Sequence, residues 1–183
     1  HSVPIRIGVN SGSLERRLLE KYGSPTPEAL VESALGHVKL LNDCDFDDIV
    51  ISIKSSDVKL MIAAYRLLAQ QVDYPLHLGV TEAGTERMGI IKSAVGIGSL
   101  LCDGIGDTIR VALTADPVKE IYAAKDILRA CDIGTGVQIV ACPTCGRTKI
   151  ALIPLAEQVE KLCAGIDKPI KVAVMGCVVN GPG

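Results

Sequence analysis

The chain alternates short apolar runs with longer segments in which apolar residues recur every three or four positions. The short runs are typical of buried strands and cover residues 4–9, 48–53, 75–80, 108–113, 137–141 and 170–175. The amphipathic helical patterns fall within residues 30–41, 58–72, 118–128 and 155–163. A strand followed by a helix, repeated along the chain, predicts the α/β class with a parallel sheet and right-handed crossovers.

Two helix starts carry clear signals. Thr26 precedes Pro27, and Asp116 precedes Pro117. Each pair puts a side-chain acceptor at the N-cap and a proline at the first helical position, where its missing N–H is not needed. We therefore expect helices to begin at both prolines.

Four strand–helix units occupy residues 1–133. A complete (β/α)8 barrel needs about 250 residues, so four units predict half of a TIM-type barrel. A new βαβ arrangement begins after the 134–136 glycine hinge and ends in a turn at residues 180–183. We therefore expect two domains, 1–133 and 134–183, and a chain that is a piece of a larger protein.

Composition excludes several classes of protein. Of the 183 residues, 48% are hydrophobic and 22% charged, with a formal net charge of -2, which excludes a disordered chain. The acidic balance argues against a nucleic-acid partner. No apolar run approaches the roughly 20 residues of a membrane span, and the first residues lack a signal pattern, so we expect a soluble protein without a membrane partner.

Strand periodicity puts a set of polar side chains on one face of the predicted sheet. Since side chains alternate faces, Arg6 and Asn10 lie opposite the aliphatic residues of their strand, and Lys54 and Arg110 do the same on theirs. Burying several cations without anionic partners is costly, so an anionic ligand at the carboxyl ends of the strands is indicated. Glu82 ends the third strand and faces the same mouth; the alternative is an ion pair with Lys54 or Arg110.

Two glycine patterns do not indicate nucleotide binding. Residues 84–89 have P-loop spacing, but Ile90 stands where a P-loop requires Lys. The Gly96-Ile97-Gly98 segment lacks the third glycine of a dinucleotide site and lies in a helical pattern. Helix packing is the better interpretation of this segment.

Seven cysteines fall into two groups. Four lie in or beside helical patterns and are expected to be small buried hydrophobes: Cys44, Cys102, Cys131 and Cys163. Cys142, Cys145 and Cys177 instead follow two predicted strands of one sheet, in turns with Pro or Gly. The odd number of cysteines fits a reducing compartment better than a disulfide framework. An iron–sulfur cluster, a zinc site and unligated thiols all remain open for the three turn cysteines.

Five motifs carry a resemblance to a known family. They are RIGVNSGSL (6–14), GVTEAG (79–84), GIGDTIR (104–110), ACPTC (141–145) and GCVVNGPG (176–183). In this order, across the whole chain, they resemble the 4-hydroxy-3-methylbut-2-enyl diphosphate synthases, iron–sulfur enzymes of the non-mevalonate isoprenoid pathway.

The resemblance implies a fold and a reaction. The fold is the second half of a (β/α)8 TIM-type barrel followed by the first part of a smaller α/β domain that holds a [4Fe–4S] cluster. The reaction is the two-electron reductive ring opening and dehydration of 2-C-methyl-D-erythritol 2,4-cyclodiphosphate.

Site residues follow by motif. Cys142, Cys145 and Cys177 resemble the cluster ligands, and Glu82 and Asn180 resemble catalytic residues near the substrate. The substrate-binding residues implied are Arg6, Asn10, Lys54 and Arg110. The family's fourth iron ligand is a Glu expected just beyond Gly183. Ala112 stands where the family usually has Ser, so no hydroxyl contact is implied there.

Partners and location are implied as well. They are a homodimer, reduced ferredoxin or flavodoxin as electron donor, and a cytoplasmic location in a bacterium or the plastid stroma in a plant. The isolated chain is expected to be inactive. Two alternatives stay open: a zinc-stabilised βα module without catalysis, and a phosphate-binding barrel lyase with incidental thiols.

Overall fold

The computed structural model describes residues 3–181. The chain forms two compact units, residues 1–127 and 128–183, and the division falls inside the helix α5 (Pro117–Ala130). Each unit has its own sheet and helices, so each is described by itself.

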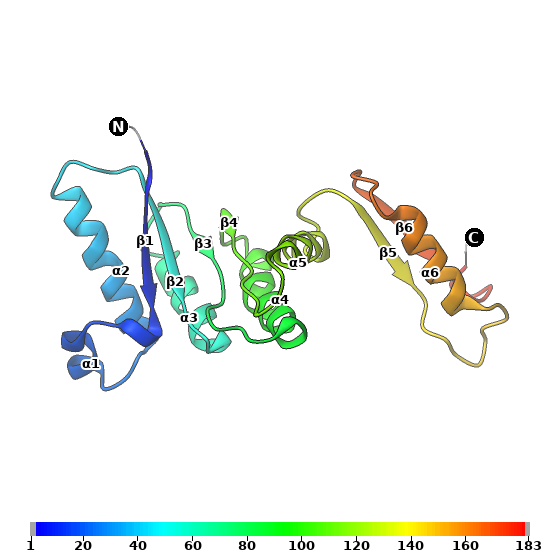
Figure 1. The fold of residues 1–183 in the computed structure, drawn as a ribbon, viewed down its shortest axis with the longest axis horizontal. Helices are drawn as coiled ribbons and strands as arrows, with labels where there is room; N and C mark the ends of the chain where they lie inside the picture. The colour runs from blue at the N-terminus through cyan, green and yellow to red at the C-terminus, as the bar shows by residue number, and fades with distance from the viewer. Residues whose placement is uncertain (1–2, 182–183) are drawn as a thin grey trace. The chain divides into compact units, whose positions relative to one another are not determined.

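The first unit repeats a strand–helix pattern (Figure 1). Its strands are β1 (Ile5–Asn10), β2 (Ile49–Lys54), β3 (His77–Leu78) and β4 (Thr108–Ile109). Its helices are α1 (Arg16–Tyr22), α2 (Pro27–Asn42), α3 (Val58–Leu68), α4 (Glu86–Cys102) and most of α5, with a 3-10 turn at Ser11–Ser13. The expected α/β class is confirmed.

The four strands follow one another in chain order. β1 and β2 are parallel and paired over their whole length, and β3 and β4 are also parallel. A bridge between Ile51 and Leu76 joins the two pairs. The described residues contain an open row of parallel strands and no closed barrel.

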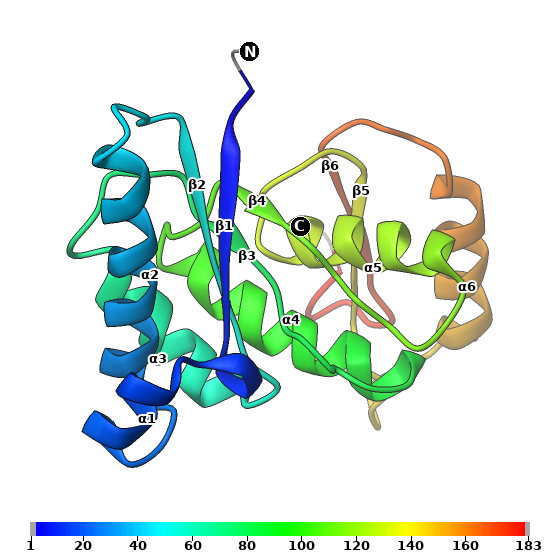
Figure 2. The same cartoon turned by 60° about the vertical axis from the view of Figure 1, so that its left-hand side comes forward.

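Helices cover one face of this row. α2 packs on β1 and β2, α3 packs on β2, and the consecutive helices α2, α3 and α4 pack on one another (Figure 2). Ile51, Ile53 and Tyr65 are completely buried in this layer. The Tyr65 hydroxyl accepts a hydrogen bond from the Ile53 N–H at 2.9 Å and donates one to the His77 carbonyl at 2.5 Å. Tyr65 therefore ties β2 to β3 from the helix side.

Both expected helix starts are confirmed. The Thr26 hydroxyl accepts a hydrogen bond from the Ala29 N–H at 3.2 Å, and α2 begins at Pro27. The Asp116 carboxylate accepts one from the Val118 N–H at 2.9 Å. These caps satisfy N–H groups that have no partner within their own helix.

Some expected bounds are wrong. The third and fourth strands are much shorter than residues 75–80 and 108–113, although the extended chain continues, since the Arg110 N–H donates to the Leu78 carbonyl at 2.8 Å. α3 ends at Leu68, so Val72 lies outside it. α1 was not predicted, because Leu18 is its only buried residue and one buried residue gives no helical repeat of apolar positions.

The second unit is a small βαβ arrangement. β5 (Val137–Ala141) and β6 (Ile170–Val174) are parallel, and α6 (Leu152–Cys163) packs on both. Its buried hydrophobic side chains in the described residues are Val137, Leu152 and Val174. Its core is therefore much smaller than that of the first unit.

Within residues 3–181, no helix combines the length and the apolar character needed to cross a membrane.

Candidate functional site

The first candidate site lies on the strand face that the helices leave uncovered. Asn10 and Lys54 are partners in the β1–β2 register, and Arg6 shares the face of Asn10 because it is four residues earlier in β1. Arg110 follows β4 directly. Arg6, Asn10 and Arg110 are exposed, and Lys54 is half-buried.

Gly79 shows how close Lys54 and Arg110 come. A Cβ atom at position 79 would lie 2.9 Å from the Arg110 carbonyl oxygen, 3.5 Å from Cε of Lys54 and 3.7 Å from Cβ of Arg110. The two cations therefore flank this glycine, which leaves a gap in the side-chain layer between them. A side chain at position 79 could fit only if the backbone of the next strand moved.

The charges of this cluster act on one another. The pKa of Lys54 is lowered to about 8, first by burial and then by the charges of Arg110 and Arg6. In the described part of the chain, no carboxylate forms an ion pair with any of the three. We refer to Arg6, Lys54 and Arg110 as the cation cluster.

The cost expected from burying these cations is largely absent. Arg6 and Arg110 are exposed in this chain, so desolvation applies mainly to Lys54. The argument for an anion thus rests on three like charges without a carboxylate partner, whose mutual repulsion an anion would relieve.

His77 lies next to the cation cluster and was not predicted from the sequence. Its pKa is lowered to about 4 by burial and by the charges of Arg6, Lys54 and Arg110. Nδ1 lies 2.8 Å from the Thr108 hydroxyl oxygen, and Nε2 is buried without a hydrogen-bond partner in the described residues. The same strand periodicity that selected Lys54 places His77 on this face, two residues before Gly79.

Glu82 lies in the loop after β3. It is exposed and has a left-handed backbone with φ 51, which is uncommon for a residue with a side chain. Among the described residues it makes no ion pair with Lys54 or Arg110, so the alternative role suggested by the sequence is not observed.

The loops at the carboxyl ends of three strands meet. The Ser11 hydroxyl donates to the Ser55 hydroxyl at 3.0 Å, and the Thr81 N–H donates to the Ser55 carbonyl at 3.3 Å. These contacts join the segments after β1, β2 and β3. Asn10, Lys54 and Glu82 therefore belong to one rim.

The second candidate site is formed by the turns after β5 and β6. Cys142 follows β5 directly, and its N–H donates to the Val174 carbonyl at 3.0 Å. The Lys149 N–H donates to the Gly176 carbonyl at 3.1 Å. The turn with Cys142 and Cys145 is thus hydrogen bonded to the segment that leads to Cys177.

Polar groups contact the sulfur atoms of two cysteines in these turns. The Asn180 side-chain amide donates to Sγ of Cys142 at 3.5 Å. The pKa of the Cys145 thiol is lowered by the Arg147 backbone N–H and by the Thr148 hydroxyl. The contacts at Cys145 favour its thiolate, the form that binds metals.

The three thiols have the chemistry of metal ligands, but in the described residues they do not lie close enough together to bind one metal ion. Three Cys on two turns at strand ends match the donors of an iron–sulfur cluster or of zinc. Within residues 3–181, however, no three His, Cys, Asp or Glu side chains lie close enough to hold a metal ion. The expected fourth ligand beyond Gly183, and residues 182–183 of the last motif, lie outside the described residues.

Both units match family models. Residues 1–125 match the GcpE TIM-barrel domain, and residues 138–183 match the GcpE protein C-terminal domain. The chain belongs to the GcpE family.

Curated relatives in this family are close in sequence. The 4-hydroxy-3-methylbut-2-en-1-yl diphosphate synthase (flavodoxin) of Geobacter sulfurreducens is 64% identical over 182 residues, which are 99% of this chain and 52% of that protein. The enzyme of the same name from Clostridium tetani is 65% identical over 182 residues, again 99% and 52%. That of Fusobacterium nucleatum is 61% identical over 183 residues, 100% and 52%. The resemblance given by the five motifs is confirmed, and the chain spans about half the length of these GcpE relatives.

The expectation for the other cysteines is wrong. Cys44 and Cys102 are exposed, and Cys131 and Cys163 are half-buried. The physical reason is their position: each is the last residue of a helix or follows its end, where fewer neighbouring turns are available to cover a side chain.

Helix packing is confirmed for the Gly96 segment. Gly96 lies in α4, and a Cβ there would approach Cε of Met61 at 2.8 Å and Cγ2 of Val80 at 3.0 Å. The glycine lets α4 pack closely on α3 and on the chain after β3.

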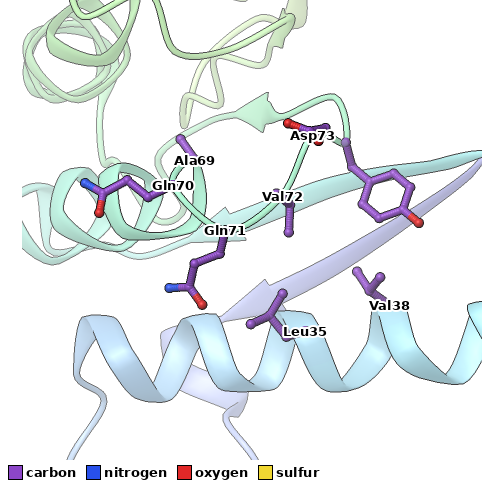
Figure 3. Close-up of a pocket in the computed structure, with 8 residues that line it drawn as sticks. Leu35, Val38, Ala69, Gln70, Gln71, Val72 and Asp73 are labelled. Carbon is purple, nitrogen blue, oxygen red and sulfur yellow. The ribbon is translucent and has the colours of Figure 1, made fainter.

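One pocket of the first unit lies away from the cation cluster. It has a volume of about 630 Å³ and is lined by Leu35 and Val38 of α2 and by residues 69–74 (Figure 3). Because residues 69–74 precede β3, this pocket is at the amino end of that strand. It contains neither cations nor thiols.

Proposed function

We propose that the full-length protein containing this chain reduces 2-C-methyl-D-erythritol 2,4-cyclodiphosphate by two electrons, opening the ring and releasing water, to give 4-hydroxy-3-methylbut-2-enyl diphosphate. The observation that carries the proposal is the cation cluster, three positive side chains on one strand face without an acidic partner in the described residues. The curated GcpE relatives carry the name of this enzyme.

In this proposal the cation cluster anchors the diphosphate. Charge-assisted hydrogen bonds from Arg and Lys to phosphate oxygens are short and strong, and Arg can form two at once. Asn10, beside Lys54 in the strand register, adds a neutral amide donor. Rigid strands fix these groups, so the part of the substrate that does not react is held while the ring opens.

Two further residues act at the reacting end of the substrate. Glu82 is exposed on the same rim and in the same loop system as Lys54, and it holds a carboxyl group near the carbon that reacts. Asn180, whose side-chain amide donates to Sγ of Cys142, is the catalytic residue proposed in the thiol turns.

Cys142, Cys145 and Cys177 would hold a [4Fe–4S] cluster, with the fourth ligand just beyond Gly183. When bound, the cluster supplies electrons and an iron that accepts oxygen ligands. Arg147 and Thr148 lower the pKa of the Cys145 thiol, and hydrogen bonds between the turns join the two ligand segments.

The reaction needs an electron donor and the remainder of the protein. Reduced flavodoxin is the proposed donor because the names of the curated relatives include flavodoxin. Reduced ferredoxin is the alternative. We also propose a homodimer, and no activity for residues 1–183 alone, since an open row of strands leaves strand edges unpaired.

Turnover tests the proposal. The anaerobically prepared full-length protein is given reduced flavodoxin and the cyclic diphosphate, and products are identified by mass spectrometry. Formation of 4-hydroxy-3-methylbut-2-enyl diphosphate is expected, and residues 1–183 assayed in parallel should form none. Unchanged substrate with the full-length protein, under conditions where a known synthase turns over, would contradict it.

A further inference from the structure

His77 occupies a defined position on the strand face, one row before Lys54 and Arg110 and one row after Arg6. The bridge between Ile51 and Leu76 puts Ser52 beside His77, and the β3–β4 register puts His77 beside Thr108. Two residues further along each strand, on the same face, come Lys54, Gly79 and Arg110. The imidazole thus lies in the row directly below the gap that Lys54 and Arg110 flank.

His77 is held at its ring and at its backbone. Nδ1 is 2.8 Å from the Thr108 hydroxyl oxygen, and the His77 carbonyl accepts the hydrogen bond of the buried Tyr65 hydroxyl at 2.5 Å. The first contact orients the ring, and the second holds the backbone that carries it. Neither contact requires a charged imidazole.

One feature of His77 has no structural use within the described residues. Its Nε2 is buried and has no hydrogen-bond partner there. A buried polar group without a partner costs about 1–3 kcal/mol, so a purely structural position would favour an apolar side chain.

The electrostatics agree with a neutral ring. Burial and the charges of Arg6, Lys54 and Arg110 lower the pKa of His77 to about 4, so the imidazole is uncharged at neutral pH. A fourth positive charge at this place would add to the repulsion within the cluster. A neutral polar ring fills the row without that repulsion.

We propose that His77 is a positioning residue of the anion site, a neutral imidazole that is oriented by Thr108 and supports Lys54 and Arg110 at the spacing a phosphate group needs. This inference rests on the proposed function, because it takes the cation cluster to be the diphosphate site. It adds a residue pair, His77 and Thr108, to that site.

The test measures binding of inorganic pyrophosphate to the full-length protein by calorimetry. His77→Leu removes the polar ring and should weaken pyrophosphate binding by about tenfold. Thr108→Val keeps the shape of an exposed side chain, removes the partner of Nδ1 and should give a similar loss. The double variant should be no weaker than the single ones, since both changes break one contact.

Two controls separate positioning from general stability. His77→Asn is uncharged and can still bond Thr108, so it should restore binding to within about threefold of wild type. His37→Leu changes a histidine on α2 whose Nε2 lies 3.4 Å from a Glu15 carboxylate oxygen, and it should leave pyrophosphate binding unchanged. A merely structural role would lower the melting temperature in His77→Leu without a rescue of affinity by Asn.

The outcomes are distinguishable. Failure of the wild-type protein to bind pyrophosphate would overturn the anion site and with it the role of His77. Normal wild-type binding together with unchanged affinity in both His77→Leu and Thr108→Val would overturn the role of His77 alone. Losses in both variants that simply add in the double variant would also overturn it.

Discussion

The two units present their candidate side chains in different ways. In the first unit, Lys54 lies on a paired strand and Arg110 directly after one, above a layer in which Ile51, Ile53 and Tyr65 are completely buried. In the second unit, the thiols lie on turns beyond the strand ends, next to a small core. The cations already act on one another, whereas the thiols are not gathered in the described residues.

This difference shows how firmly a strand and a turn can fix the positions of side chains in a site. Parallel register sets the spacing of side chains on one face without any ligand. A turn held by a few backbone hydrogen bonds is set less firmly, and metal binding commonly completes such a site while it completes the fold. We therefore expect the anion site to be preformed and the thiol site to be organised by its metal.

The largest expected effect is the loss of turnover when a thiol of the second unit is replaced. Cys142→Ser, Cys145→Ser and Cys177→Ser in the full-length protein should each abolish turnover and strongly reduce bound iron and sulfide, because each removes a thiolate ligand. Cys44→Ser and Cys131→Ser are the matched controls and should keep both. Anaerobic iron, sulfide and activity assays check this, and an active Cys177→Ser protein would rule out its role as a ligand.

The next effect concerns the cation cluster. Lys54→Met or Arg110→Met should weaken pyrophosphate binding by about 10- to 100-fold, since a charge-assisted contact is worth about 1.5–3 kcal/mol. Bound iron should not change, because the thiols lie in the other unit. Calorimetry and thermal melts provide the measurement. Normal affinity in Arg110→Met with a much lower melting temperature would mean a structural role instead.

A smaller effect follows from the acidity of Lys54. Its pKa of about 8 means that the ammonium group is charged below that pH and loses its proton above it. Pyrophosphate binding should therefore weaken by up to about tenfold between pH 7 and pH 9. Lys54→Arg stays charged throughout and corrects for the titration of pyrophosphate itself. Identical pH profiles for the two proteins would contradict the expectation.

The smallest effect lies on the helix side of the first unit. Thr26→Ala removes the N-cap of α2 and should lower the free energy of unfolding by about 1 kcal/mol. Pyrophosphate affinity should stay the same because the cap is remote from the strand rim. Chemical denaturation and calorimetry on one preparation test both statements, and a change in affinity would show that the strand face is less preformed than proposed.

Periodicity explains how much of this could be predicted from sequence. A repeat of two fixes which face a strand residue takes, so the common face of Arg6, Lys54 and Arg110 followed from the pattern alone. The same pattern places His77 on this face. It was not predicted as a site residue because the argument from charge selects Lys and Arg, and a neutral imidazole carries no formal charge. The ends of β3 and β4 could not be predicted because they depend on hydrogen bonds between strands far apart in sequence.

The turns and helix ends were less predictable. Nothing in a Cys-x-x-Cys spacing sets where a third thiol lies, since that depends on the conformation of a distant turn. Burial of Cys44 and Cys102 was inferred from neighbouring helical patterns, but a helix end exposes what the middle of a helix would bury. The roles of the site residues, the homodimer and the cellular location stay predictions.

Metal analysis of the anaerobically purified full-length protein tests the central claim most directly, because the claim joins a preformed anion site to a thiol site organised by an iron–sulfur cluster. Iron and acid-labile sulfide should be present in about equal amounts, near four of each per chain, as a [4Fe–4S] cluster requires. Zinc without sulfide would contradict the account and favour a zinc-stabilised module without this catalysis.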